Sequence, residues 1–435
     1  MKHNLMMMCL LSGLSLPVWG QSTLDDCIRY AWKHNPNLKS AYIDRKEART
    51  DYVSAIGKFL PEISVQAEVG RQIGRSVDPD TNGYTTNSYN QGTVGLDVTL
   101  SLFEGFVRVN RLRYAHYTEK EKEWEYMTKR NELAYQVVEA YYKAILNEKL
   151  SELASEQLRL GEHYLKQTET YVELGLKSVS DLREIKARYQ GDVFKYHSYE
   201  KNRRLSFLYL KEILGMEEKD SLSISLLLDE SSISQMPSLK TEEIYVQSIH
   251  MLPDYKRMEM WEQAARREYA TALGLFSPTV FARLSWRSNY YNSLFSIHQL
   301  NDHWNKYIGI GVSFSIFNRL DRYAGVKKKK LTLQRVRNSI EEEKLHLRNE
   351  TEQLVLSLYE GWEQYKQVTL QVDAETQVMK ETERKWEEGL VSVFQLMETR
   401  NRLLATKAEK ISTRLQHELL LRLAMYYQTG KFIND

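Results

Sequence analysis

Side chains that commonly carry enzyme chemistry form no recognisable motif in this chain of 435 residues. The sequence has no glycine-rich phosphate loop, no His-Glu-x-x-His zinc motif, no Cys-x-x-Cys pair and no Gly-x-Ser-x-Gly nucleophile turn. Histidines are scattered along the chain, and placement on the surface explains His163, His197, His298 and His346. We therefore expect no catalytic residue, no cofactor and no metal ion, and we expect that the protein is not an enzyme.

Two glycine–serine turns have the residue types and spacing with which one helix ends and the next begins. The first runs from Gly175 to Leu182 as Gly-Leu-Lys-Ser-Val-Ser-Asp-Leu, and the second from Gly389 to Leu396 as Gly-Leu-Val-Ser-Val-Phe-Gln-Leu. Glycine allows the left-handed backbone that ends a helix, and the serine three residues later has the spacing of a helix N-cap. Each segment is expected to join two helices. Capping explains the serines, but two rigid turns are also a surface that a partner could recognise.

The turns belong to an internal duplication of about 215 residues, a period that indicates repeated structural units. Pro36 and Pro61 recur as Pro253 and Pro278, in each case 217 positions later, and the two glycine turns lie 214 positions apart. The halves thus differ by about one helical turn. We divide the chain into a signal peptide (1–20), a first repeat (21–215), a linker (216–240), a second repeat (241–430) and a C-terminal tail (431–435).

The N-terminus has the composition of a secretory signal peptide. Lys2 precedes an apolar run over 5–16, and Val18 and Gly20 occupy the −3 and −1 positions before the expected cleavage site. Removal of this peptide leaves Cys27 as the one cysteine, which excludes an internal disulfide. Lysine and arginine number 60 against 58 aspartate and glutamate residues, so there is no basic surplus for nucleic acid. We expect a secreted, disulfide-free and non-lipidated envelope protein.

Proline-free stretches predict long helices. No proline lies between Pro79 and Pro237 or after Pro278. Gly105–Val172 and Arg319–Trp386 each span about 68 residues, which as a helix reach about 100 Å. Shorter helices are expected over 22–60, 179–214, 241–277 and 393–429. Two rods of this length do not fit in a compact globular domain.

Alternating apolar and polar residues predict strands of about 9 to 11 residues, the length that a tilted strand needs to cross a bilayer. These strands are expected around 63–69, 94–102, 280–286 and 308–316. A soluble two-sided sheet would show the same alternation. Four strands cannot close a barrel, because an open edge leaves backbone groups unpaired, so other copies must complete a membrane sheet. A water-filled interior favours three copies, although the sequence leaves two or four open.

Taken in order, the duplicated motifs resemble those of the TolC-like outer membrane efflux proteins. The motifs are Asn35-Pro36, Leu102 to Gly105 and the two glycine turns, and the match runs from Leu24 to about Thr429. The resemblance implies a mainly α fold with a small membrane β-barrel. Duplicated long-helix hairpins would form an α-barrel, and four strands per chain would contribute to a trimeric 12-stranded β-barrel.

The resemblance also implies a function and a set of partners. Such a protein is the outer membrane exit duct of a tripartite efflux pump or a type I secretion system, and it conducts substrates passively to the exterior. Its expected partners are further copies of the chain in a homotrimer, a periplasmic adaptor (membrane fusion) protein, an inner-membrane transporter and outer membrane lipid. The expected location is the outer membrane, with a long periplasmic extension. The exported substrate and the pump are not determined by the sequence.

Two groups of site residues follow from the resemblance. Adaptor docking at the hairpin tips implicates Gly175, Ser178, Asp181, Leu182, Gly389, Ser392 and Leu396. Candidates for a periplasmic gate are Trp386, Gln395 and Glu398. Only Glu398 keeps the acidic side chain of the family, and a ring of three such carboxylates would attract cations.

The chief alternative is an envelope scaffold that forms no channel. In this reading the long helices form a coiled coil, and the alternating segments form a small soluble sheet. Extraction distinguishes the two readings, because a scaffold would stay soluble whereas a duct would need detergent.

Overall fold

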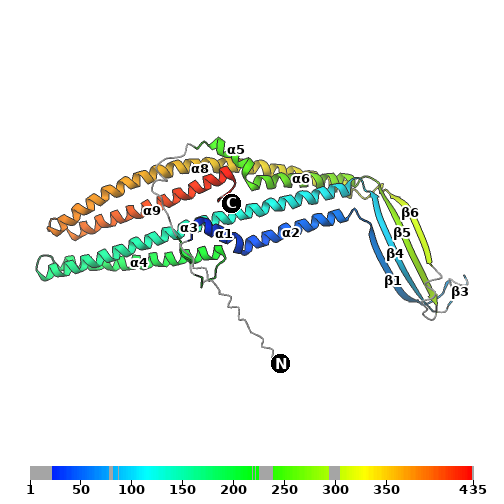
Figure 1. Ribbon diagram of the computed structural model, residues 1–435, viewed down its shortest axis with the longest axis horizontal. Coiled ribbons are helices and arrows are strands. Elements are labelled where there is room, and N and C mark those ends of the chain that lie inside the picture. The colour runs from blue at the N-terminus through cyan, green and yellow to red at the C-terminus, as the bar shows by residue number, and fades with distance from the viewer. Residues whose placement is uncertain are drawn as a thin grey trace, which may run out of the picture. The chain divides into compact units, whose positions relative to one another are not determined.

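The computed structural model describes residues 22–77, 82–86, 88–217, 219–220, 222–224, 239–292 and 304–433 (Figure 1). The predicted signal peptide (1–20) and most of the predicted linker (216–240) lie outside the described residues. Within the described part, one order of elements occurs twice: two short helices, two main strands and two long helices. No helix in these ranges is both long and apolar enough to cross a membrane.

The long helices follow the proline-free stretches closely. They are α3 (Val107–Glu173), α4 (Val179–Leu214), α8 (Asp321–Glu387) and α9 (Val393–Thr429). α3 and α8 are each 67 residues long and begin two residues later than predicted. α4 and α9 have the predicted bounds. One glycine turn joins α3 to α4, and the other joins α8 to α9.

The shorter helical segments differ from the prediction, because each is split at its proline. The resulting helices are α1 (Leu24–His34), α2 (Pro36–Gly57), α5 (Thr241–Met251) and α6 (Pro253–Gly274). The residue before each proline is extended, with ψ of 125° at Asn35 and 131° at Leu252. Proline disfavours helical backbone in the residue before it and is well suited to the first position of a helix. Each proline therefore starts a second helix, whereas the sequence had suggested one helix over 22–60 and one over 241–277.

Four strands form one antiparallel sheet in the order β1–β4–β5–β6 (Figure 1). They are β1 (Glu62–Gln72), β4 (Tyr89–Phe103), β5 (Thr279–Asn292) and β6 (Trp304–Ser313), while β2 (Ser76–Val77) and β3 (Tyr84–Thr85) form a separate small hairpin. β1, β4 and β5 extend further into polar segments than predicted, because ladder hydrogen bonds join backbones and need no apolar side chain. β6 begins before the predicted Ile308 and ends before the predicted Ile316.

The register of the sheet gathers the apolar residues on one side. One row of directly paired residues crosses all four strands and consists of Ile63, Val98, Leu284 and Ile308. The next row lies on the opposite side and consists of Ser64, Asp97, Ser285 and Tyr307. Because side chains alternate between the two sides of a strand, every second residue follows one of these rows. We call the two sides the apolar face and the polar face.

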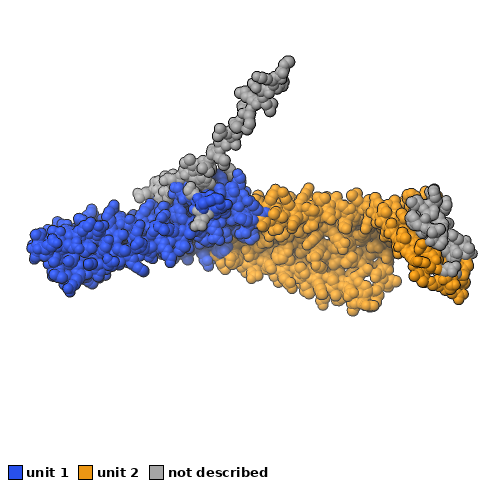
Figure 2. All heavy atoms as spheres, turned by 90° about the horizontal axis from the view of Figure 1, so that it is seen from below, with its two compact units in different colours: residues 1–39, 129–248, 350–435 blue, residues 40–128, 249–349 orange. Residues whose placement is uncertain are grey.

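The chain packs as two compact units, and both repeats contribute to each (Figure 2). Unit 1 falls within residues 1–39, 129–248 and 350–435, and unit 2 falls within residues 40–128 and 249–349. In unit 1, Leu354 and Leu358 of α8 form a core cluster with Ala424 of α9. In unit 2, Ala265 of α6 clusters with Leu333 of α8. The sheet belongs to unit 2, and both glycine turns belong to unit 1.

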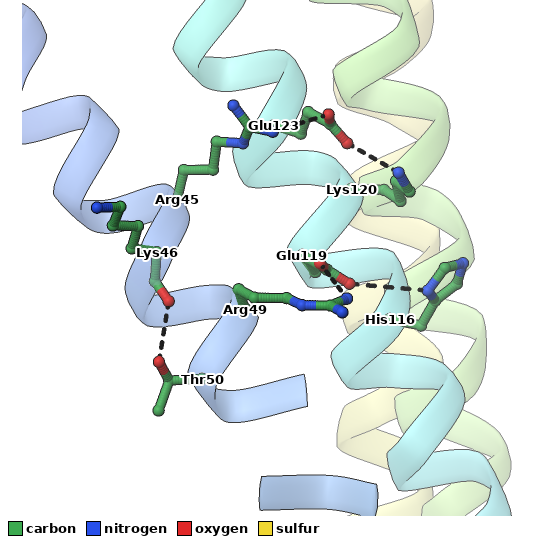
Figure 3. A network of polar contacts seen from close by, with 8 residues as sticks. All are labelled: Arg45, Lys46, Arg49, Thr50, His116, Glu119, Lys120 and Glu123. Carbon is green, nitrogen blue, oxygen red and sulfur yellow. Dashed lines mark hydrogen bonds and ion pairs between the residues drawn. The ribbon is translucent and has the colours of Figure 1, made fainter. Parts of the chain in front are cut away.

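In unit 2, α2 is joined to α3 by ion pairs near the surface (Figure 3). The guanidinium of Arg45 lies 3.2 Å from Glu123, and that of Arg49 lies 2.8 Å from Glu119. Lys120 contacts the same Glu123 at 2.8 Å. Exposed pairs of this kind contribute at most about 1 kcal/mol each. They connect α2 to α3 side by side but add little stability.

The start of each long helix has the same unusual backbone. Gly105 and Phe106 precede α3 with φ of 60° and 61°, while Arg319 and Leu320 precede α8 with φ of 57° and 67°. An arginine adopts the left-handed backbone in the second repeat, so φ alone does not require glycine at position 105. Glycine is required at position 105 because the backbone of Gly274 approaches closely, and a Cβ on Gly105 would collide with the carbonyl oxygen of Gly274.

We expect Gly105→Ala to lower the free energy of unfolding by about 2–5 kcal/mol, because left-handed alanine costs about 1–2 kcal/mol and overpacking about 1–3 kcal/mol. The midpoint of thermal unfolding of the purified protein, followed by circular dichroism, measures the change. Arg319→Ala is the matched control, since this position already accepts a Cβ with the same φ. An unchanged midpoint for Gly105→Ala would contradict the close-approach argument.

Candidate functional site

Both glycine turns end their long helices in the same way. Gly175 has φ of 70°, and Gly389 has φ of 77°. The N–H of Leu176 donates to the carbonyl oxygen of Tyr171 at 2.8 Å, and the N–H of Leu390 makes the equivalent bond to Lys385 at 2.8 Å. A left-handed glycine with this bond is a Schellman ending, which satisfies carbonyl groups left free at the end of a helix. The prediction that both glycines stop helices is confirmed.

The two return helices are capped differently. The Oγ of Ser178 accepts a bond from the N–H of Asp181 at 3.1 Å, and the carboxylate of Asp181 accepts from the N–H of Ser178 at 3.1 Å. This is the complete capping box that the spacing predicted. Ser392 caps α9 by accepting from the N–H of Gln395 at 3.3 Å. The first turn is thus held by a reciprocal pair of bonds and the second by the serine half of the motif.

An open hollow of about 630 Å³ lies between the two turns within unit 1. Its lining comes from both turns and comprises Gly175, Leu176, Lys177, Ser178, Asp181, Gly389, Leu390, Val391, Ser392 and Val393. Large apolar side chains around it are exposed, with Leu176 and Leu390 exposed to 66% and 70%. Leu174, Val179 and Phe394 are also more than half exposed. Exposed apolar surface gathered in one place is typical of an interaction site.

A buried aromatic cluster supports the turns from within. Trp386 is fully buried, and its ring lies 5.5 Å from that of Tyr164 in a nearly perpendicular arrangement. The Nζ of Lys177, in the first turn, donates to the carbonyl oxygen of Trp386 at 3.3 Å and lies 5.4 Å from the centre of its ring. One cation therefore ties the first turn to the end of the second long helix. The sequence shows this difference between the repeats, because Lys177 of the first turn is replaced by Val391 at the equivalent position of the second.

Polar groups below the cluster also join elements that are far apart in the sequence. The hydroxyl of Tyr164 donates to Glu383 at 2.6 Å. Burial, followed by this carboxylate, raises the pKa of Tyr164 well above its usual value, so the phenol stays protonated and keeps donating. Deeper in unit 1, Arg400 of α9 forms a buried ion pair with Asp192 of α4. A Cβ on Gly161 would lie 2.8 Å from the Asp192 carboxylate, so glycine in α3 leaves room for the pair.

The structure places the predicted site residues in different environments. The exposed ones among the predicted docking residues are Gly175, Ser178, Gly389 and Ser392, while Asp181 and Leu182 are half-buried. Leu396 is fully buried in the aromatic cluster. Among the gate candidates, Gln395 and Glu398 are exposed on α9, whereas Trp386 is buried. Docking and gating stay predictions, and the direct contribution of Leu396 and Trp386 is to support the turns.

The described residues offer little for metal or thiol chemistry. No group of three or more His, Cys, Asp and Glu side chains in these ranges could hold a metal ion. Cys27 is completely buried in α1, and this burial raises the pKa of its thiol to about 12. Nucleophilic chemistry requires the thiolate, so this cysteine is a packing residue.

Comparisons with known proteins bear on both family and fold. The profile of the family described as outer membrane efflux protein matches residues 27–216, which cover nearly all of the predicted first repeat. None of the curated proteins compared with the chain matches it.

Solved structures with a similar fold come from several bacteria. The outer membrane protein VceC from Vibrio cholerae is 15% identical with a TM-score of 0.78, over 94% of this chain and 96% of that one. The CmeC outer membrane channel of Campylobacter jejuni is 14% identical with a TM-score of 0.78, over 95% and 87%. A membrane protein from Pseudomonas aeruginosa is 15% identical with a TM-score of 0.79, over 93% and 90%. At these identities the likeness shows the fold alone, and the family match covers the first repeat: over residues 27–216 the chain is similar to the outer membrane efflux protein family, as the motifs predicted.

Proposed function

We propose that the chain forms the outer membrane exit duct of a tripartite efflux pump or a type I secretion system and passively conducts substrates to the exterior. The observation that carries this proposal is the division of the sheet into an apolar and a polar face across all four strands. On the apolar face, Val65, Ile308 and Ile310 are exposed to between 72% and 78%. Rows of exposed branched aliphatic side chains suit lipid, and the opposite face then lines a wet passage.

Charges on the polar face support the same orientation. Asp97 of β4 is buried beneath two guanidinium groups of β5, with Arg287 at 3.1 Å and Arg283 at 3.7 Å. Both arginine side chains remain about half exposed. Charged groups facing lipid at mid-bilayer would cost about 2–4 kcal/mol each, whereas a lumen accepts them.

The edges of the sheet support assembly from several copies. β1 and β6 are its outer strands, so each has one edge that is not paired within the described chain. An unpaired backbone group in hydrocarbon costs several kcal/mol, and a closed ring of strands removes this cost. Pairing of β6 in one copy with β1 in the next closes the ring, and three copies supply twelve strands. Twelve exceeds the eight that side chains can fill, which leaves room for water.

Exposed apolar side chains on a helix of unit 2 also support assembly with other copies of the chain. α2 exposes large apolar side chains, namely Tyr42, Ile43, Val53 and Ile56. These groups stay between 43% and 54% exposed on the same helix as the ion pairs to α3. Neighbouring copies of the chain would bury them, as expected for a wall of helices around a passage.

The hairpin tips are the proposed docking surface for a periplasmic adaptor, which in turn would contact an inner-membrane transporter. The open hollow between the turns and the exposed Leu176, Leu390 and Phe394 support this role. The left-handed glycines and the serine caps hold both turns rigidly, so a partner would bind a preformed surface.

The assembly can be tested on the purified protein. Because the sheet edges must be paired, we expect detergent to be needed for extraction and native mass spectrometry to show a trimer that resists dissociation. A stable monomer would contradict the proposed assembly. A protein that is released from cells without detergent would favour the envelope scaffold.

The orientation of the sheet can be tested with two neighbouring substitutions in β4. Val98→Arg places a guanidinium on the apolar face and should impair insertion, at a cost of about 2–4 kcal/mol per chain near mid-bilayer. Thr99→Arg is the matched control, because Thr99 lies on the polar face opposite Glu62, which can pair with the new charge. The heat-stable trimer in outer membrane fractions is the quantity to measure. Equal insertion of both variants would show that the faces are assigned wrongly.

The docking role can be tested at the glycines of the turns. A Cβ at Gly175 or Gly389 meets no atom within 4 Å, so Gly175→Val or Gly389→Val acts through backbone strain, about 1–3 kcal/mol. We expect normal insertion, weaker cross-linking to the adaptor and loss of export. Gly191→Val is the control, because Gly191 lies on α4 with open space around it and without a left-handed backbone. Undiminished cross-linking and export in both turn variants would refute docking at the tips.

A further inference from the structure

Three bulky side chains on the polar face of the sheet lie flat against it, each over a glycine. The pairs are Phe281 over Gly311, Tyr307 over Gly309 and Arg287 over Gly95. Phe281 and Arg287 each cross to the residue directly opposite on the neighbouring strand, whereas Tyr307 leans along its own strand. Glycine in a strand interior often marks a place where another group approaches closely. Here the approaching groups are side chains that would otherwise stand up from the sheet.

The contacts show that glycine is needed at these positions. A Cβ on Gly309 would collide with the hydroxyl and ring of Tyr307, and a Cβ on Gly311 would collide with the ring of Phe281. The colliding atoms are the far ends of side chains, so a methyl group would displace the ring and leave the backbone in place. Gly70 shows that this is not general, because it lies on the same face in β1 and meets no atom within 4 Å.

A flat Tyr307 leaves open space above the sheet. The polar face carries a hollow of about 270 Å³ that is lined by Arg283, Ser285, Arg287, Asn289, Asn305 and Tyr307. Tyr307 borders this hollow while its ring leans away over Gly309. A ring that stood upright would enter the hollow and project above the face.

We propose that Gly309 and Gly311 set the size of solute that can pass the strand region, because they let Tyr307 and Phe281 lie flat. This inference rests on the proposed function, in which the polar face lines the passage. In a trimer the same rings occur three times around the lumen, so a small movement of each one narrows the passage from three sides. Pore diameter is a primary determinant of what a channel passes. The two glycines are thus size-determining residues rather than stability residues.

A reporter cysteine beyond these rings measures the size limit. Ser313 is exposed on the polar face at the end of β6, past Gly309 and Gly311 when approached from the loop end of the strand. In cells carrying Ser313→Cys, maleimides linked to polyethylene glycols of increasing mass are added from outside. The rate of labelling by each reagent is divided by the rate for a small maleimide. Cys27 is completely buried and gives little background.

We expect Gly309→Ala to lower the mass of the largest reagent that labels Ser313→Cys, because the added methyl group forces the Tyr307 ring into the passage. Adding Tyr307→Ala to this variant should restore or enlarge the limit. Tyr307→Ala alone should change it little, because the flat ring occupies little of the passage. Such non-additivity is the signature of a direct contact between the two residues. Gly70→Ala, the matched control, should behave as the wild type.

Two results would overturn the inference. One is a Gly309→Ala variant that inserts normally and keeps the wild-type size limit. The other is that Tyr307→Ala raises the size limit by the same amount in the wild-type background as in the Gly309→Ala background. The second comparison replaces the exposed Tyr307 in both backgrounds, and Gly311→Ala with Phe281→Ala repeats the test at an independent pair. If the small maleimide does not reach Ser313→Cys from outside in the otherwise wild-type chain, the proposed function itself fails.

Discussion

Backbone pairing at the edges of the sheet is the constraint on which the rest of the structure depends. The four main strands of one chain form an open sheet whose two halves are joined by the pairing of β4 with β5. These two strands come from different repeats. Its outer strands, β1 and β6, also come from different repeats. The junction inside the chain is therefore of the same kind as the junction that a second copy would make. Duplication supplies, within one chain, a template for the pairing that assembly must complete in a medium without water.

The two repeats share their order of elements, but different side chains stabilise the equivalent helix ends and turns. Left-handed residues precede both long helices, yet glycine is needed at position 105 and arginine serves at position 319. Both turns end in a left-handed glycine, but only the first has a complete capping box and a lysine bonded to the other hairpin. Symmetry of the backbone thus coexists with asymmetry of the side chains. In the proposed trimer, six similar tips would present two alternating surfaces.

Features that depend on local backbone chemistry were predictable from the sequence. The bounds of α4 and α9 follow from a serine cap at one end and the lack of proline inside, and the apolar alternation located all four main strands. The splits at Pro36 and Pro253 were missed, because proline is compatible with the first turn of a longer helix as well as with a new start. Ile316 alternates like a strand residue but lies beyond β6, since alternation in sequence does not ensure a pairing partner.

The side-chain geometry of the tips was not predictable, because it depends on contacts between segments far apart in the chain. Lys177 reaches Trp386, and Asp192 reaches Arg400, across more than two hundred residues in each case. A match of position to a family places Trp386 near the turn but does not say that its ring points into the core. That burial changes its role: the ring fills the space under a hollow whose lining includes the exposed Leu176 and Leu390. The docking surface proposed above needs such a filled core beneath it to bind a partner without collapsing, so in that proposal the buried aromatic cluster and the exposed leucines serve one purpose.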